Sequence, residues 1–225
     1  MKNVLVLGAS SGIGSCLTNK LLDGGCQVYG TYFKNKVEQN HPNLITSFFD
    51  LQNSSSFEFE LPEQLDGFVY CPGTINLKPF RSLKQDDFKH EFEVNVLGFV
   101  KTLQLLLKTL KKSQSASVLA FSSVCAQRGF NFHTSTSTSK AALEGLFVSL
   151  AKEYAPNIIF NLIAPSIIQT SLSKHLLDTE EKVERIASTH PISRIGQPQD
   201  IVSIAYHILT ESSWMTGQVI KVDGG

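Results

Sequence analysis

Cysteine is scarce in this chain, and the few cysteines are not arranged for metal binding or cross-linking. The four residues Cys16, Cys26, Cys71 and Cys125 form no Cys-x-x-Cys pair, and none has a histidine at metal-ligand spacing. This arrangement predicts reduced thiols, no metal site and a cytosolic location.

Net charge and long apolar runs are also absent. Lys and Arg number 20 and Asp and Glu number 20, a balance that offers no attraction for nucleic acid or an anionic membrane. No apolar stretch reaches the ~18 residues that a bilayer-spanning helix needs, and the apolar run near residue 1 is too short for a signal peptide. We therefore expect no nucleic-acid and no membrane partner, and a single domain over residues 1–225.

What the sequence does contain is an alternation of short apolar runs and longer amphipathic stretches. The predicted strands cover residues 4–7, 27–32, 44–49, 68–70, 117–121, 158–163 and 218–222. The predicted helices cover residues 11–22, 88–110, 134–155 and 198–209, and the third and fourth strands lie too close for a full helix between them. The alternation predicts an α/β fold, a Rossmann-type doubly wound, seven-stranded parallel sheet flanked by helices in three α/β/α layers.

The loop after the first predicted strand, residues 8–14 (GASSGIG), is suited to binding phosphate. Gly8 permits a tight turn, Gly12 lets the backbone approach a phosphate, and Gly14 lets helix and strand pack closely. The following helix N-terminus offers free N–H groups and a positive dipole end. We therefore predict a site for a dinucleotide pyrophosphate, with a tight structural turn as the alternative.

The Gly-x-x-x-Gly-x-Gly spacing resembles the short-chain dehydrogenase/reductase family, and further motifs extend the resemblance along essentially the whole chain. Asn95 falls within a predicted helix as that family's catalytic Asn does, Ser123 ends a strand, and Lys140 follows on the next helix. Residues 161–166 and 217–225 resemble two more family signatures. The resemblance implies an NAD(P)(H)-dependent oxidoreductase that moves a hydride between its cofactor and a carbonyl or alcohol. It also implies a homo-oligomer, tetramer or dimer, paired through the two long helices.

The resemblance further implies which residues contact the cofactor. These are Gly8, Ser10, Ser11, Gly12, Ile13, Gly14, Tyr32, Lys34, Asp50, Leu51, Cys71, Gly73, Asn95, Lys140, Pro165, Ile168 and Thr170. Asp50 stands where the family has an Asp near the adenine, and Ser166 replaces a usual glycine. Residues 171–190 correspond to the mobile segment that closes over substrate.

The sequence departs from the family at one catalytic position. The family unit is Asn, Ser, Tyr and Lys, and the Tyr position, four residues before Lys140, is Thr136 here. Thr136 lies thirteen residues after Ser123, which is the family spacing, so the register is kept. An aliphatic alcohol acidifies poorly, and its oxygen ends roughly 4 Å short of a tyrosine oxygen. Losing a general acid typically costs ~10²–10⁴ in rate.

Three hypotheses account for this departure. The proton could come from His133, one helical turn from Thr136, or from Ser135, Ser123 or a water held by Lys140. The substrate could need little help with the proton, as an imine or quinonoid group would. The protein could also bind NADP(H) as a catalytically silent sensor or partner subunit, and deliberate replacement of the Tyr is a fourth alternative. The catalytic candidates are Asn95, Ser123, Thr136, Lys140 and His133.

The stretch after the second predicted strand bears on the choice of cofactor. Residues 31–36 (TYFKNK) hold two lysines and no acidic residue, whereas NAD-specific family members usually place an acid there. A ribose 2′-phosphate would meet positive charge, so NADP(H) is favoured and NAD(H) stays open. Phe130, Phe132 and His133 are expected to line a pocket for an apolar or planar small-molecule substrate, whose identity the sequence leaves open.

Overall fold

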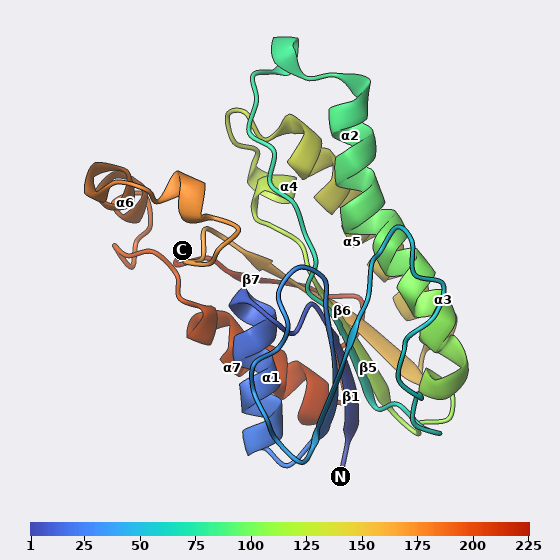
Figure 1. Ribbon diagram of the computed structural model, residues 1–225. Helices are drawn as coiled ribbons and strands as arrows, with labels where there is room; N and C mark the ends of the chain where they lie inside the picture. The colour runs from blue at the N-terminus through green and yellow to red at the C-terminus, as the bar shows by residue number, and fades with distance from the viewer.

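Seven parallel strands form one sheet in the computed structural model, which describes residues 1–225 (Figure 1). The order across the sheet is β3-β2-β1-β4-β5-β6-β7. The strands are β1 Asn3–Leu7, β2 Gln27–Tyr32, β3 Leu44–Phe48, β4 Gly67–Tyr70, β5 Ala116–Phe121, β6 Ile158–Pro165 and β7 Val219–Val222. The strand order reverses between β1 and β4, which is where doubly wound sheets bind ligands. The predicted seven-stranded Rossmann-type sheet is confirmed.

Helices cover both faces of this sheet. Helices α1 (Gly12–Asp23) and α7 (Pro198–Thr210) pack on one face, and α3 (Gly98–Leu110) and α5 (Thr134–Tyr154) on the other (Figure 1). The remaining helical elements are η1 Phe80–Ser82, α2 Gln85–Phe92, the π-helical segment η2 Glu93–Leu97, α4 Cys125–Arg128, η3 Lys174–Leu176 and α6 Glu180–Ala187. None of the helices has an apolar stretch long enough to cross a bilayer.

Strand β1 shows why the strands of this sheet are continuous apolar runs in the sequence. Val4 and Val6 face the cluster under α1 and α7, while Leu5 and Leu7 face the cluster under α3 and α5. Successive side chains of a strand point to opposite faces. A strand that is covered on both faces must therefore be apolar throughout, rather than alternating with polar residues.

Some predicted boundaries are wrong. The helix predicted over residues 88–110 begins earlier, at Gln85, and is interrupted by the π-helical segment η2. The third strand ends at Phe48 instead of residue 49, and the sixth strand continues to Pro165. The prediction contained none of α4, α6, η1 and η3, because these short elements lack an apolar period long enough to recognise.

The connection between β3 and β4 contains no helix, as predicted. Aromatic side chains cover that part of the sheet instead. The Phe57 ring stacks on Phe49 at a centroid distance of 4.7 Å, and the Phe59 ring lies 5.6 Å from that of Tyr29. These large rings thus supply the apolar cover that a helix would otherwise give.

Candidate active site

The glycine loop has the backbone conformation that only glycine adopts readily. Gly8 and Gly12 have φ values of +84° and +54°. A Cβ at Gly14 would overlap the carbonyl oxygen of Gly8, so helix α1 could not pack as closely with any other residue there. Ser11, the N-cap of α1, makes no side-chain capping hydrogen bond. The first-turn N–H groups of α1 are therefore available to a phosphate.

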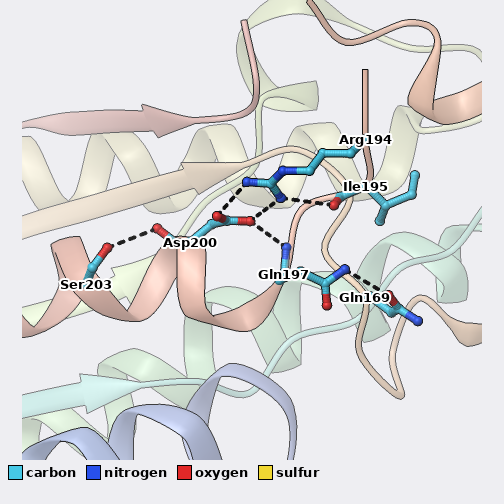
Figure 2. A network of polar contacts seen from close by, with 6 residues as sticks. All are labelled: Gln169, Arg194, Ile195, Gln197, Asp200 and Ser203. Atoms are coloured by element: carbon cyan, nitrogen blue, oxygen red, sulfur yellow. Dashed lines mark hydrogen bonds and ion pairs between the residues drawn. The ribbon is translucent and has the colours of Figure 1, made fainter. Parts of the chain in front are cut away.

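The segment after β6 lies against this loop. A Cβ on Gly12 would lie 3.4 Å from the Thr170 methyl carbon. The side chain of Gln197, at the start of α7, donates a hydrogen bond of 2.8 Å to Gln169. Figure 2 shows that the same turn is fixed by Arg194, whose guanidinium binds both carboxylate oxygens of Asp200 at 2.6 and 2.7 Å.

Asp200 also accepts a hydrogen bond from the Gln197 backbone N–H at 2.7 Å. The bonds from Arg194 and Gln197 lower the pKa of Asp200 to about 2. Its carboxylate therefore stays charged at neutral pH and keeps the Gln197 side chain near Gln169. The turn before α7 thus holds the predicted cofactor contacts Ile168 and Thr170 at the glycine loop, and Ile168 forms a β-bridge with Gly196.

Asn95 lies in the π-helical segment η2 and is completely buried. Its Oδ1 accepts the Thr74 backbone N–H at 3.3 Å, and its Nδ2 donates to Glu91 Oε2 at 2.9 Å and Ser139 Oγ at 3.0 Å. The Tyr70 hydroxyl donates to the Val94 carbonyl of η2 at 2.5 Å. Single-turn π segments often occur at functional sites, and this one turns Asn95 toward both the β4 loop and α5.

Lys140 reaches the same place from α5. Its Nζ donates to the carbonyl oxygen of Phe121, the last residue of β5, at 2.7 Å. A Cβ on Gly73 would lie 3.5 Å from both Lys140 Nζ and Asn95 Oδ1. Burial lowers the pKa of Lys140 to about 8, although nearby Glu91 and Cys125 act in the opposite direction. The structure therefore brings Gly73, Asn95 and Lys140 together at the carboxyl ends of β4 and β5.

The hydroxyl groups of the site have different surroundings. Ser123 follows β5, is half-buried, and accepts the Cys125 backbone N–H at 3.3 Å. Thr136 is only 2 % exposed, and its Oγ1 accepts the Asn76 backbone N–H at 3.1 Å. Ser135 is buried with its hydroxyl unpartnered. Thr136 therefore anchors the segment after β4, whereas Ser123 keeps its hydroxyl partly accessible.

His133 is the N-cap of α5 and lies at the rim of the site. Its Nδ1 lies 2.8 Å from the Asn131 carbonyl oxygen, which can only accept, so Nδ1 carries the proton and Nε2 can accept one. The Phe130 ring lies 5.6 Å from the His133 ring. Phe130 and Phe132 are 48 % and 55 % exposed, so they form the edge of the site and not a closed pocket wall.

The predicted adenine-side residues lie at or just after the ends of β2 and β3. Tyr32 is half-buried and Lys34 is exposed. The Asp50 carboxylate accepts from Asn53 Nδ2 at 2.8 Å and from the Gln52 N–H at 2.9 Å, and these bonds lower its pKa. Leu51, which follows Asp50, is half-buried.

Cys71 lies directly under the glycine loop. Burial raises the pKa of its thiol to about 12, so the thiol is neutral and acts as a small apolar side chain there. Its Sγ would lie 3.2 Å from a Cβ on Gly14, which shows how closely this residue underlies the loop. Of the remaining predicted loop contacts, Ser10 and Ser11 lie between β1 and α1, and Ile13 lies in the first turn of α1.

The prediction from sequence missed four residues of the site: Thr74, Asn76, Glu91 and Ser139. All four hydrogen-bond to Asn95 or Thr136. Glu91 alone had a sequence signal, because it precedes Asn95 by four residues and therefore lies on the same face of the predicted helical run. No group of three or more His, Cys, Asp and Glu side chains is placed to hold a metal ion.

A glycine loop at β1 and an Asn, Ser and Lys at the ends of β4 and β5 together define a class of protein, the oxidoreductases that use a nicotinamide dinucleotide. The family model described as enoyl-(acyl carrier protein) reductase matches residues 8–225. The chain belongs to the short-chain dehydrogenase/reductase family.

Curated relatives and solved structures agree with this placement. The 7alpha-hydroxysteroid dehydrogenase of Escherichia coli (strain K12) is 32 % identical over 80 % of this chain and 71 % of its own. The 3-oxoacyl-acyl-carrier-protein reductase of Buchnera aphidicola is 26 % identical over 100 % of this chain and 96 % of its own. The aldohexose dehydrogenase of Thermoplasma acidophilum superposes with a TM-score of 0.86 at 25 % identity, covering 100 % and 93 % of the two chains. ElxO with NADP bound gives 0.85 at 25 % identity, covering 100 % and 98 %.

Lys140 should give the protein a characteristic pH-dependent stability. Its folded-state pKa of about 8 lies below its ordinary value of 10.5, so the unfolded chain holds this proton more tightly between those two pH values. The cost of burying the ammonium is present below pH 8 and is relieved as the pH rises through that interval. We expect the free energy of unfolding of the wild-type protein, relative to Lys140→Met, to rise by roughly 3 kcal/mol between pH 7 and 10.5.

Urea unfolding at a series of pH values measures this difference. The exposed Lys152 offers a matched control, because Lys152→Met removes a lysine of the same helix without removing a buried charge. The quantity to follow is the free energy of unfolding of the wild-type protein minus that of Lys140→Met. If this difference stayed constant between pH 7 and 10.5, Lys140 would not titrate in that interval.

Proposed function

We propose that this protein is an NADPH-dependent reductase that transfers a hydride to a carbonyl, imine or quinonoid carbon, with Lys140 supplying the proton to the acceptor atom. The observation that carries the proposal is the position of Lys140 Nζ, buried beside Gly73 and Asn95 at the carboxyl end of the sheet. NADPH supplies the hydride when it is bound. A lysine whose pKa burial lowers to about 8 holds a proton at neutral pH and releases it more readily than an exposed lysine would.

The position of Thr136 supports Lys140 as the donor. An aliphatic hydroxyl acidifies poorly, and that of Thr136 is buried beneath the Asn76 N–H, whose bond it accepts. Thr136 therefore serves as the anchor of the loop that follows β4. That loop is tied to α2 as well, since Lys78 and the Asn76 side chain both bind Asp87, at 2.6 and 3.1 Å.

Substitutions distinguish the possible proton donors. We expect Lys140→Met to lower kcat for NADPH-dependent reduction by ~10²–10⁴, the usual cost of losing a general acid. Thr136→Val should lose less than ~10-fold, because it removes an anchoring hydrogen bond and no acid. The measurement is NADPH oxidation followed by absorbance with a panel of ketones, imines and quinones.

Other results of this assay would assign the proton differently. A loss on His133→Ala as large as that on Lys140→Met would make His133 the acid. The wild-type protein could also bind NADPH and reduce none of the panel, with turnover appearing only in Thr136→Tyr. That result would identify a catalytically silent NADP(H)-binding protein, the alternative raised by threonine at position 136.

We further propose NADP(H) as the cofactor, because Lys34 and Lys36 are exposed after β2 and no acidic residue stands among residues 31–36. A ribose 2′-phosphate forms charge-assisted bonds with such lysines. The solved structure of ElxO holds NADP, and that likeness supports the same choice here.

Fluorescence titration with NADPH and NADH, side by side, checks the cofactor preference. We expect Lys34→Glu to weaken NADPH binding by about 10-fold or more and to leave NADH binding within about twofold. Lys152→Glu, an equal charge change on the exposed face of α5, should alter neither titration. Tighter binding of NADH than NADPH by the wild-type protein would overturn the choice of NADP(H).

The exposed aromatic edge at Phe130 and Phe132 supports an apolar or planar substrate. Phe132 is held in place because its carbonyl accepts the Lys78 N–H at 3.1 Å, which fixes the edge to the loop after β4. The hydroxysteroid dehydrogenase among the relatives is named for a substrate of this kind.

We also propose that the protein is a homo-oligomer, a tetramer or dimer, paired through the α2–α3 and α5 helices. Phe92 and Leu97 on the first of these and Val148 on the second are 38 %, 44 % and 54 % exposed. A second copy would bury these apolar side chains. Light scattering should give a mass at least twice that of the chain, and a monomeric mass would contradict the proposal.

A further inference from the structure

Glu91 is a fully buried carboxylate of helix α2, where this helix packs against α5. It is 0 % exposed, one carboxylate oxygen accepts from Asn95 Nδ2 at 2.9 Å, and the other has no hydrogen-bond partner. Removing a charge from water is costly unless the charge is paired. Phe99 and Leu103, farther along the same helical run, meet the core with apolar side chains. A carboxylate at this position therefore lowers stability, which is typical of residues kept for function.

A short chain of contacts connects Glu91 with Lys140. Asn95 Nδ2 donates both to Glu91 and to Ser139, the residue before Lys140. Asn95 Oδ1 and Lys140 Nζ are equally close to Gly73, at 3.5 Å from the position of a Cβ there. Asn95 thus links the buried carboxylate to the segment of α5 that carries Lys140, and Glu91 and Lys140 form no direct ion pair.

Few groups other than Glu91 affect the charge of Lys140. Helix α4 contributes the Cys125 thiol and strand β5 contributes the Phe121 carbonyl oxygen, while Glu91 is the one carboxylate that raises the pKa of Lys140. Burial acts against this charge and lowers the same pKa. In a low-dielectric interior, a buried carboxylate affects the pKa of an ammonium more strongly than it would in water.

We propose that Glu91 is a positioning residue for proton transfer, whose buried carboxylate holds Asn95 at the β4 loop and keeps Lys140 in the ammonium form beside the substrate. The proposal rests on the proposed reductase function. An N–H bond of Lys140 breaks as the O–H or N–H bond of the reduced product forms, and the hydride goes to carbon. The neutral amine then regains a proton from water, and the negative charge of Glu91 favours that step.

The pH profile of turnover tests this role, because a purely structural role would not move it. We expect Glu91→Gln to shift the alkaline limb of the kcat profile to lower pH by about one pH unit, since the lysine loses its buried counter-charge. Glu93→Gln is the matched control, an exposed glutamate of the same helical run, and it should leave the profile unchanged. NADPH titration should give the same affinity for both variants as for the wild-type protein, within about twofold.

A second measurement needs neither substrate nor cofactor. The pH at which Lys140→Met begins to change the free energy of unfolding is set by the folded-state pKa, so it should lie about one pH unit lower in a Glu91→Gln background than in the wild-type background. The upper end of the interval, which the unfolded chain sets, should stay in place. If the Glu91→Gln variant does not fold, Glu91→Leu can be used as the background instead, because a leucine needs no hydrogen-bond partner. An unchanged interval, or a kcat profile that Glu91→Gln leaves in place, overturns the inference.

The two measurements separate this inference from the proposed function. A shifted unfolding interval in a protein that binds no NADPH would support the link between Glu91 and Lys140 and would refute the reductase. NADPH-dependent turnover with an unshifted interval would support the reductase and would refute the role of Glu91.

Discussion

Parallel pairing of β1 with β4 and of β4 with β5 sets the position of every group in the candidate site. Leu7 pairs with Tyr70, and Tyr70 pairs with Ala120, so these strands end at the same edge of the sheet. The residues that follow are the glycine loop, the Cys71 to Gly73 turn and Ser123. Helices α3 and α5 pack on one face of the same strands, and the η2 segment before α3 and the start of α5 bring Asn95 and Lys140 to that edge. If the strand order were different, these residues would lie on separate parts of the surface.

The polar cluster at this edge works against the stability of the core that surrounds it. Lys140 and Glu91 are charged groups in an apolar layer, and a buried pair is often no more stable than apolar residues of similar size. The hydrogen bonds of Asn95 and the Phe121 carbonyl offset part of this cost. Proteins tend to break the rules of core packing where they need chemistry. In the proposed reaction, the same burial that destabilises the ammonium of Lys140 would make it a better proton donor near neutral pH.

Thr136 changes how the family site is built. A threonine is short enough to lie under the Asn76 backbone, so the loop after β4 closes over this part of helix α5 and is fastened to α2 through Asp87. In the function that we propose, the Thr136 hydroxyl holds a loop and Lys140 supplies the proton.

The sequence alone determined the sheet, the glycine loop and the approximate place of Asn95, Ser123 and Lys140. These depend on local features, which are apolar runs of strand length, a glycine pattern and residue types at strand ends, and local features are visible in a sequence. It did not reveal the start of the long helix at Gln85 or its π-helical segment, because the Tyr70 hydroxyl that binds the Val94 carbonyl comes from a distant strand.

Only the tertiary structure decided which buried groups face one another. The turn of α2 against α5 places Glu91 and Ser139 on the two sides of Asn95, and this depends on how two helices pack, which no residue spacing within either helix specifies. The lowered pKa of Lys140 likewise follows from the burial of its side chain in the folded protein. Solvent exclusion is a property of the assembled core, and for that reason the charge state of the site could not be read from the order of its residues.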